Sequence, residues 1–144
     1  MNPRTPIFFD LVRPSLEEVE ARMRERTGDH HAALDSAIDH LLSSGGKRVR
    51  PTVVLLTAAM LGGERQRAVT LAAAIEMLHT ATLVHDDLID GALLRRGTPT
   101  LNAQWTPGAT VLTGDYVFAR AAHLAAQTGS IDVMEMFART LMTI

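Results

Sequence analysis

The stretch EMLHTATLVHDDLID, residues 76–90, decides how the rest of this sequence is interpreted. Its apolar run predicts a helix, which at about 100° per residue places Asp86, Asp87 and Asp90 within an arc of about 100°. His79 projects to roughly the same arc, about 10 Å away along the helix axis. The stretch therefore predicts a helix that gathers three carboxylates on one side of its last turns.

Like charges on one face of a helix repel each other, and each i,i+4 pair costs about 0.2–0.5 kcal/mol. A bound cation reverses this sign, and Mg²⁺ binds one or two carboxylates together with waters and substrate phosphate oxygens. The other interpretation is a solvated acidic helix end, because a DDxxD string is common by chance. From this pattern alone, both interpretations stay open.

The bulk composition indicates one all-α globular domain. The 144 residues are 47% apolar and only 4% aromatic, and the alternation typical of strands is almost absent. A net charge of −2 gives no reason to expect nucleic-acid binding, and the lack of cysteines excludes disulfides and thiolate metal sites. The longest apolar stretch, residues 53–63, is about half of the ~20 residues that span a membrane, so we expect a cytoplasmic protein without a membrane span.

About six helices are expected. Residues 1–13 contain Pro3 and Pro6 and are expected to form an irregular arm. Ser15 and Glu18 form a capping-box pattern that predicts a helix over 16–26, ended by residues 27–29. Further helices are expected at residues 31–43, 52–61, 64–93, 109–127 and 131–142. The segment 52–61 is apolar almost all round, which predicts a buried central helix.

The segment GGKRVRP, residues 45–51, combines two glycines with three cations, Lys47, Arg48 and Arg50. The glycines allow the backbone to approach a ligand closely, and the start of a helix at Pro51 adds partial positive charge. These features suit an anion site, most naturally one for phosphate. The alternative is an ordinary basic turn between helices, which is the more common origin of such a segment.

A second basic segment, RRGTPT at residues 95–100, begins five residues after Asp90. The forked donors of Arg95 and Arg96 match phosphate oxygens. The alternative is a surface turn whose arginines pair with the neighbouring aspartates and neutralise them. The acids, the two basic segments and the apolar helix between them together indicate a substrate with a diphosphate at one end and a hydrocarbon at the other.

Three further polar residues on the expected helices carry weaker signals. His79 shares the face of the acids, and a ligand role and a core role are equally supported. His85 points away from that face and is expected to be a hydrogen-bonded core residue. Asp115 is expected to be a buried acid paired with an arginine, with a water-orienting role as the alternative.

Taken in order, these strings resemble the trans-type isoprenyl diphosphate synthases, or polyprenyl synthetases. The matching strings are GGKRVRP at 45–51, His79, HDDLID at 85–90, RRGTPT at 95–100 and GDYVFAR at 114–120. The resemblance covers essentially the whole chain, which would form the N-terminal part of such a domain. It implies an isoprenoid-synthase fold, with helices around a central cavity and the acids at its mouth.

The resemblance also implies a reaction and a role for each site residue. Isopentenyl diphosphate would condense head to tail with an allylic prenyl diphosphate after the allylic C–O bond ionises. Asp86 and Asp90 would bind Mg²⁺ and serve catalysis, with Asp87 supporting them as the third metal residue. Arg95 would contact the allylic diphosphate. The diphosphate of isopentenyl diphosphate would be held by Lys47, Arg50, His79 and Arg96.

Product length is implied by the two residues that stand four and five positions before the first aspartate of the motif. In the family these positions line the path of the growing chain, and bulky aromatics there stop elongation early. Here they are Thr82 and Ala81, which suggests a product longer than farnesyl. An ideal helical wheel places Ala81 away from the carboxylates, so this expectation rests on the family.

The family also has a second aspartate-rich motif in its C-terminal half, and nothing after Gly129 supplies it. We therefore expect the 144-residue chain to be incomplete and inactive alone, with apolar faces that a partner or further chain covers. The main alternative is a non-catalytic small or regulatory subunit of a heteromeric synthase. A terpene cyclase is disfavoured because it needs no second diphosphate site, and a purely structural helical domain fits the charged segments poorly. Self-association, as in the homodimers of the family, is expected.

Overall fold

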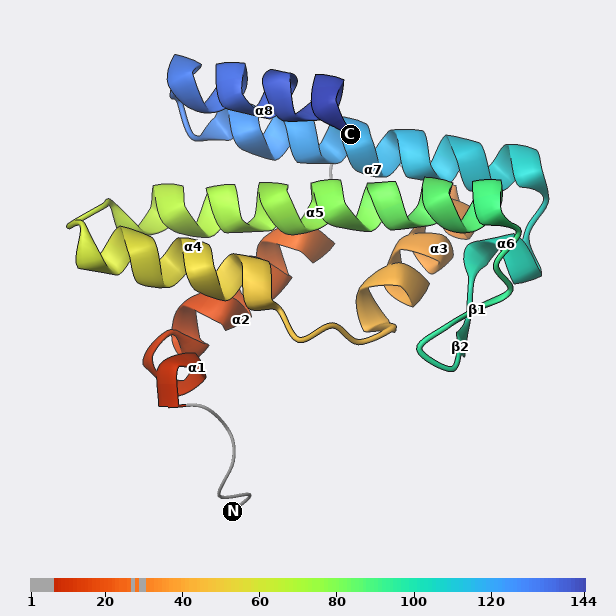
Figure 1. Ribbon diagram of the computed structural model, residues 1–144, viewed down its shortest axis with the longest axis horizontal. Coiled ribbons are helices and arrows are strands. Elements are labelled where there is room, and N and C mark those ends of the chain that lie inside the picture. The colour runs from red at the N-terminus through yellow and green to blue at the C-terminus, as the bar shows by residue number, and fades with distance from the viewer. Residues whose placement is uncertain (1–6, 27, 29–30) are drawn as a thin grey trace.

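The computed structural model describes residues 7–26, 28 and 31–144, and within these ranges it is all-α apart from one small hairpin (Figure 1). The elements are α1 (Ile7–Leu11), α2 (Arg13–Arg24), α3 (Ala32–Ser43), α4 (Val49–Met60), α5 (Arg65–Asp90), β1 (Leu94–Arg95), β2 (Thr98–Pro99), α6 (Leu101–Gln104), α7 (Pro107–Gln127) and α8 (Ile131–Thr143). The predicted all-α class is confirmed.

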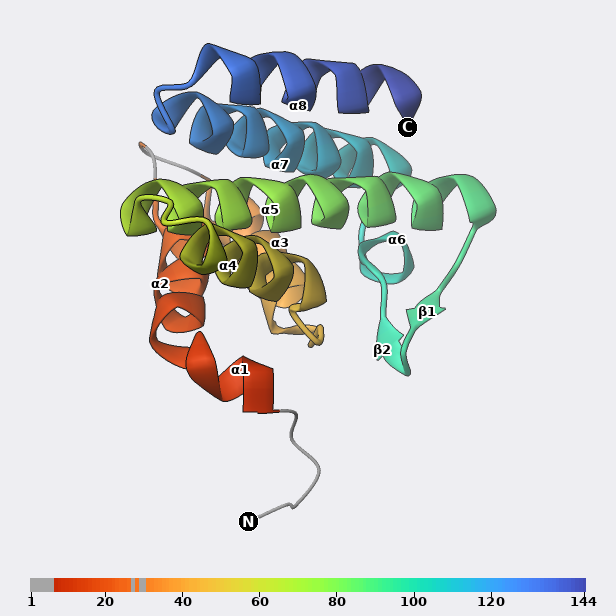
Figure 2. The same cartoon turned by 60° about the vertical axis from the view of Figure 1, so that its left-hand side comes forward.

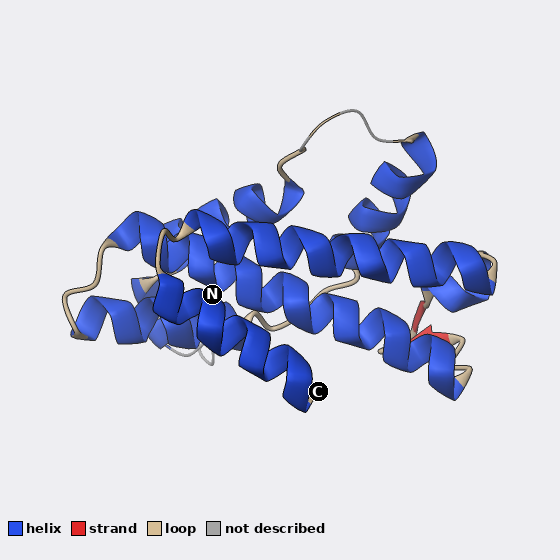
Figure 3. Ribbon diagram, turned by 90° about the horizontal axis from the view of Figure 1, so that it is seen from above, coloured by secondary structure: helices blue, strands red, loops and turns tan. Residues whose placement is uncertain are grey.

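Helix α5 is the centre of the arrangement. It runs the length of the molecule, with α7 and then α8 stacked on one side and α4 and α2 on the other (Figures 1 and 2). Seen from above, the long helices run side by side and the strands lie at one end (Figure 3). The end of α5 that carries the aspartates is therefore the end beside the hairpin.

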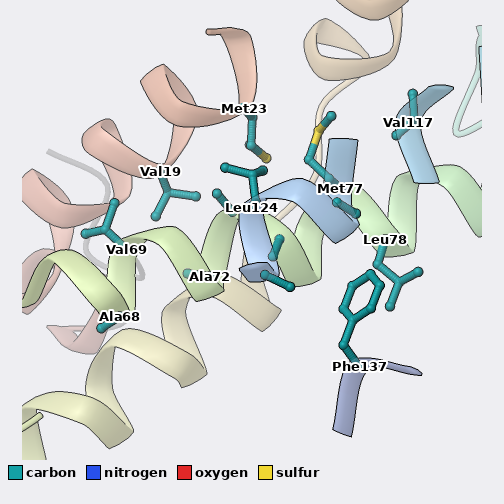
Figure 4. Close-up of a cluster of buried hydrophobic side chains, with 14 of the residues drawn as sticks. Val19, Met23, Ala68, Val69, Ala72, Met77, Leu78, Val117, Leu124 and Phe137 are labelled. Atoms are coloured by element: carbon teal, nitrogen blue, oxygen red, sulfur yellow. The ribbon is translucent and has the colours of Figure 1, made fainter. Parts of the chain in front are cut away.

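The hydrophobic core lies along α5, where side chains of α2, α7 and α8 meet it (Figure 4), and Leu42 of α3 and Leu55 of α4 belong to the same cluster. Val19 of α2, Met77 of α5 and Leu124 of α7 are almost fully buried, and Phe137 of α8 closes the cluster. Each such side chain contributes about 1.5–3 kcal/mol when it leaves water. The core therefore fixes the long helices relative to one another and holds the end of α5 in place.

The prediction that residues 52–61 form the buried central helix is wrong. Helix α4 packs on one side of α5 and buries Pro51, Thr52 and Leu55, whereas Val53 and Met60 are 56% and 84% exposed. An apolar composition alone does not tell a central helix from a peripheral one whose second face is open.

Helix α5 is long and apolar enough to cross a membrane, with a mean hydropathy of 1.3 over its most apolar 18 residues. However, 61% of that window is buried inside the fold, as expected for a core helix. The helix starts after Glu64, whose side chain accepts from the backbone N–H groups of Gln66 and Arg67. It ends at Gly91, whose φ of 65° stops it before the predicted end at residue 93.

Several predicted boundaries near the N-terminus are wrong. Ser15 lies inside α2 instead of capping it, because Pro14 already sits in the first turn, and its hydroxyl accepts from Arg65 Nε. The short helix α1 occupies part of the predicted irregular arm, and α6 occupies part of a segment without predicted helix. The first six residues of the arm, and Thr27 and Asp29 at the predicted helix end, lie outside the described residues.

Candidate functional site

An open pocket of about 340 Å³ lies between the end of α3, the start of α4, the second half of α5 and the hairpin. Its lining includes the five residues that the sequence assigned to diphosphate binding, namely Lys47, Arg50, His79, Arg95 and Arg96. They come from three separate segments of the chain. The structure thus brings the four assigned cations and His79 to the same hollow, and Arg48 lines it as well.

The hairpin that carries two of these arginines is a tight two-residue turn. Leu94 pairs with Pro99 and Arg95 with Thr98, while Arg96 and Gly97 take φ values of 49° and 76°. Two successive positive φ values are the mark of the type I′ turn, whose twist matches that of the strands. The sequence predicted a turn here, and the structure shows that it is paired on both sides.

Two contacts join this hairpin to the opposite wall of the pocket. His40 Nε2 of α3 lies 2.7 Å from the carbonyl oxygen of Pro99, and Arg96 Nη1 donates to the carbonyl of Gly45 at 3.5 Å. Sequence reasoning missed the role of His40 because its partner is 59 residues away. The pattern of residues around His40 gives no indication of a contact with Pro99.

Asp87 and Arg95 form a two-pronged ion pair. Arg95 Nε donates to the two carboxylate oxygens at 3.1 and 2.9 Å, and Nη2 donates to Oδ1 at 2.5 Å. Asp87 is buried, and its hydrogen bonds raise the pKa of Arg95 above its ordinary value. For Arg95 and Asp87, the structure therefore matches the alternative interpretation of the RRGTPT segment, in which its arginines pair with the neighbouring aspartates.

Asp86 and Asp90, by contrast, are exposed on the last two turns of α5, one helical turn apart. Within the described residues no set of three His, Asp or Glu side chains is placed to hold a metal by itself. Two exposed carboxylates do fit Mg²⁺, which binds one or two protein carboxylates and takes its other ligands from water and phosphate. The oxygens of Asp87 already accept from Arg95, which leaves Asp86 and Asp90 as the candidate metal pair.

His79 lies on the pocket wall with its ring half-buried. Burial lowers its pKa below the ordinary value, and the positive charges of Arg50, Arg95 and Arg96 lower it further against the opposing effect of Glu76. The ring is therefore neutral at pH 7 and offers hydrogen bonds, whereas the neighbouring arginines supply the charge.

Arg48 does not join the cationic face that the sequence assigned to it. Its side chain is only 18% exposed and forms ion pairs with Glu20 and Glu76, whereas Lys47 and Arg50 on either side are exposed. All three cations of the segment line the pocket, but only Lys47 and Arg50 are exposed there, whereas Arg48 is held by its two carboxylate partners.

His85 and Asp115 form a contact between α5 and α7. His85 Nε2 lies 3.4 Å from Asp115 Oδ1 and 3.3 Å from the carbonyl of Val111, and its ring packs on Phe118 with centroids 5.3 Å apart. His85 is hydrogen-bonded, as predicted, but its side chain is 26% exposed, so it is not a core residue. The prediction for Asp115 is wrong, because this side chain is 59% exposed and pairs with a histidine.

The two residues assigned to product length lie outside the pocket lining. Ala81 is fully buried in the core, and the hydroxyl of Thr82 donates to the carbonyl of His79 at 2.6 Å. The structure thus places Ala81 away from the acids, as the ideal wheel did. Its link to product length stays a prediction.

The family model for polyprenyl synthetases matches residues 31–144. The chain is 38% identical to component 2 of the heptaprenyl diphosphate synthase of Geobacillus stearothermophilus, over 95% of this chain and 43% of the relative. It is 42% identical to the geranylgeranyl diphosphate synthase of Saccharolobus solfataricus, over 80% of this chain and 34% of the relative.

Among solved structures, the polyprenyl synthase of Caulobacter crescentus in complex with calcium and isoprenyl diphosphate superimposes with a TM-score of 0.86. The sequences are 36% identical, and the match covers 92% of this chain and 40% of that one. The chain therefore spans well under half the length of the relatives that it matches.

Proposed function

Because this chain belongs to the polyprenyl synthetase family, we propose that it forms the diphosphate- and magnesium-binding part of an isoprenyl diphosphate synthase. The proposed reaction is the head-to-tail condensation of isopentenyl diphosphate with an allylic prenyl diphosphate. The enzyme is thus a prenyltransferase of the polyprenyl or geranylgeranyl type.

The observation that carries this proposal is the single pocket that Lys47, Arg50, His79, Arg95 and Arg96 line together. Four cations and a neutral histidine match the charge and the many acceptors of a diphosphate. Lys47, Arg50, His79 and Arg96 are assigned to isopentenyl diphosphate. Arg95, which Asp87 holds beside the acids, is assigned to the allylic diphosphate.

Asp86 and Asp90 would hold Mg²⁺, since they are exposed and one helical turn apart. When bound, Mg²⁺ neutralises charge on the diphosphate that leaves. Calcium in the complex of the Caulobacter relative supports a divalent cation in this family. Asp87 acts indirectly, because it fixes the guanidinium of Arg95 in one orientation instead of offering its own oxygens to the metal.

The chain's own cations then act where negative charge develops. The fork of Arg95 is held in place before substrate arrives, so it needs little reorganisation when the allylic C–O bond breaks. His79 donates a hydrogen bond without adding charge. For product length we propose a chain longer than farnesyl, supported by the small residues Ala81 and Thr82 and by the names of the two relatives.

A second candidate is a non-catalytic small or regulatory subunit of a heteromeric synthase. The relative from Geobacillus is named component 2, which supports a partner subunit. In either form we propose self-association or a partner chain, and a cytoplasmic location, because the most apolar helix is the core helix α5.

The test is a Mg²⁺-dependent prenyl-transfer assay on the purified chain, with labelled isopentenyl diphosphate and geranyl or farnesyl diphosphate. Turnover that Asp86→Ala abolishes would support an enzyme complete in 144 residues, and the length of the product would test the assignment of Ala81 and Thr82. Binding of both diphosphates without turnover would support the part of a synthase that needs a partner. A folded chain that binds neither diphosphate would contradict the proposal.

A further inference from the structure

Arg48 is the one cation of the GGKRVRP segment that faces inward. Each of its three guanidinium nitrogens has an acceptor: Nε donates to Glu20 of α2, Nη1 to Glu76 Oε1 of α5 at 3.2 Å, and Nη2 to the carbonyl of Leu42 at 3.2 Å. One side chain thus joins α2, α5 and the end of α3.

The charges of this cluster do not favour a phosphate at Arg48. Two carboxylates surround one guanidinium, so Glu20, Glu76 and Arg48 together carry a formal charge of −1. In addition, Glu76 Oε2 is buried on the pocket wall and accepts from no donor among the described residues. An anion in the pocket is therefore drawn to the exposed Lys47 and Arg50 and away from this cluster.

The backbone of the segment is shaped around the same side chain. Arg48 has a φ of 50°, a left-handed conformation that non-glycine residues adopt only where the surroundings hold them in it. Its carbonyl accepts from the backbone N–H of Thr52 at 3.1 Å and from the hydroxyl of Thr52 at 2.7 Å, which begins α4. A Cβ on Gly46 would lie 3.0 Å from Arg48 Nη1, so the turn passes close over the guanidinium.

From these contacts we infer that Arg48 is a positioning residue, anchored by Glu20 and Glu76, which sets the turn at residues 45–48 so that Lys47 and Arg50 face the pocket. This inference deepens the proposed function and rests on it for the identity of the ligand. Burial acts to lower the pKa of Arg48, but the hydrogen bonds and charges of Glu20 and Glu76 outweigh it and raise the pKa, so the cluster keeps its charge.

The variant Glu20→Gln tests this inference, because Glu20 lies on α2, outside the pocket lining, and its ion pair within the described part of the chain is with Arg48. We expect the affinity for inorganic diphosphate, measured by calorimetry, to fall by roughly tenfold as the turn loosens. Glu17→Gln, which makes the same charge change at an exposed position of the same helix, is the matched control and should leave the affinity unchanged. If Arg48 were instead a phosphate ligand, its release from Glu20 would leave the affinity equal or higher, and that result overturns the inference.

The conservative variant Arg48→Lys separates the two roles again. A lysine keeps the positive charge but lacks the planar guanidinium that donates to three acceptors at once. If Arg48 is a positioning residue, Arg48→Lys should therefore lower the affinity for inorganic diphosphate. If Arg48 is a phosphate ligand, the lysine should largely retain that affinity. Affinity close to that of the wild type in Arg48→Lys would overturn the inference.

A measurement without ligand keeps the two proposals distinguishable. In Glu20→Gln, the backbone amide of Thr52, which donates to the carbonyl of Arg48, should exchange hydrogen roughly tenfold faster, while core amides of α5 keep their rates. Unchanged exchange at Thr52 overturns the inference whether or not diphosphate binds. If exchange is faster in Glu20→Gln but the wild type binds no diphosphate, the positioning role of Arg48 stands and the proposed function is rejected.

Discussion

Asp86 and Asp87 are adjacent in sequence and have opposite surroundings. Asp86 is exposed beside Asp90, whereas Asp87 is buried and accepts three hydrogen bonds from Arg95. Asp87→Asn should therefore lower the free energy of unfolding by about 1–3 kcal/mol, because it removes charge-assisted bonds to Arg95. Asp86→Asn should change it by less than about 0.5 kcal/mol, since it relieves a like-charge pair with Asp90.

Urea denaturation of both variants, with calorimetry of Mg²⁺ in the presence of inorganic diphosphate, checks this contrast. Asp86→Asn should weaken Mg²⁺ binding without a loss of stability. Equal loss of stability in the two variants would show that Asp87 has no special role in the fold.

The lowered pKa of His79 links stability to pH. In the unfolded chain the histidine titrates near its ordinary value of about 6.5, and in the folded chain below it. Between these two values the unfolded state binds one more proton, so stability falls as the pH drops from about 6.5 toward the folded pKa. His79→Gln removes this contribution, and its stability should change less than that of the wild type between about pH 7.5 and 5.5.

Urea denaturation at the two pH values measures this difference. His123→Gln, which replaces an exposed histidine of α7 outside the pocket, serves as the control and should retain more of the wild-type dependence than His79→Gln. A wild type and a His79→Gln variant with the same pH dependence would contradict the burial of this ring.

At the scale of helices, the close approach of α5 and α7 depends on Gly114. A Cβ at this position would lie 2.3 Å from His85 Nε2, far inside van der Waals contact. Gly114→Ala should therefore displace the ring of His85, which would lose its contacts with α7, and destabilise the fold by about 1–3 kcal/mol. Because His85 adjoins Asp86, the metal pair should also be displaced, and Mg²⁺ binding in the presence of diphosphate should weaken.

Gly108 provides the matched control in the same helix. Nothing lies within 4 Å of a Cβ built there, so Gly108→Ala should keep or raise the stability, by up to about 1 kcal/mol. Thermal unfolding of the two variants gives the answer. A Gly114→Ala variant as stable as Gly108→Ala would mean that the ring of His85 can move aside without cost.

The helices themselves were predictable where local signals are strong. The long apolar period gave α5, and Ile131 begins α8 as predicted. The hairpin was predicted only as a turn, because its two strands have two residues each and leave no alternation to detect. The prediction that α4 is a buried central helix was wrong, because the sequence pattern of one helix does not show where the neighbouring helices lie.

The residues of the candidate site likewise fall into those that the sequence predicted and those that it did not. The five pocket residues could be assigned because their residue types and spacing match a known family, and the structure brings them together. The inward orientation of Arg48 could not be predicted, since it depends on Glu20, 28 residues away on another helix. The pairing of His85 with Asp115 likewise depends on how closely two helices approach.

At the scale of the whole molecule, α4 presents an apolar stripe to solvent. Val49, Val53 and Met60 are 51%, 56% and 84% exposed, and the last two are seven residues apart, so they share a face. Contiguous exposed apolar surface favours association, and a net charge of only −2 opposes it weakly. We therefore predict concentration-dependent self-association of the 144-residue chain, detectable by sedimentation velocity.

The double variant Val53→Lys with Met60→Lys places two charges in the stripe and should shift the chain toward monomer at the same concentration. Ala59→Lys adds a lysine at an exposed small residue of α4 and should shift this balance less. If the wild type sediments as a monomer at every concentration, the stripe does not drive association. If Ala59→Lys dissociates the chain as effectively as the double variant, added charge is the cause and the position of the lysines is not.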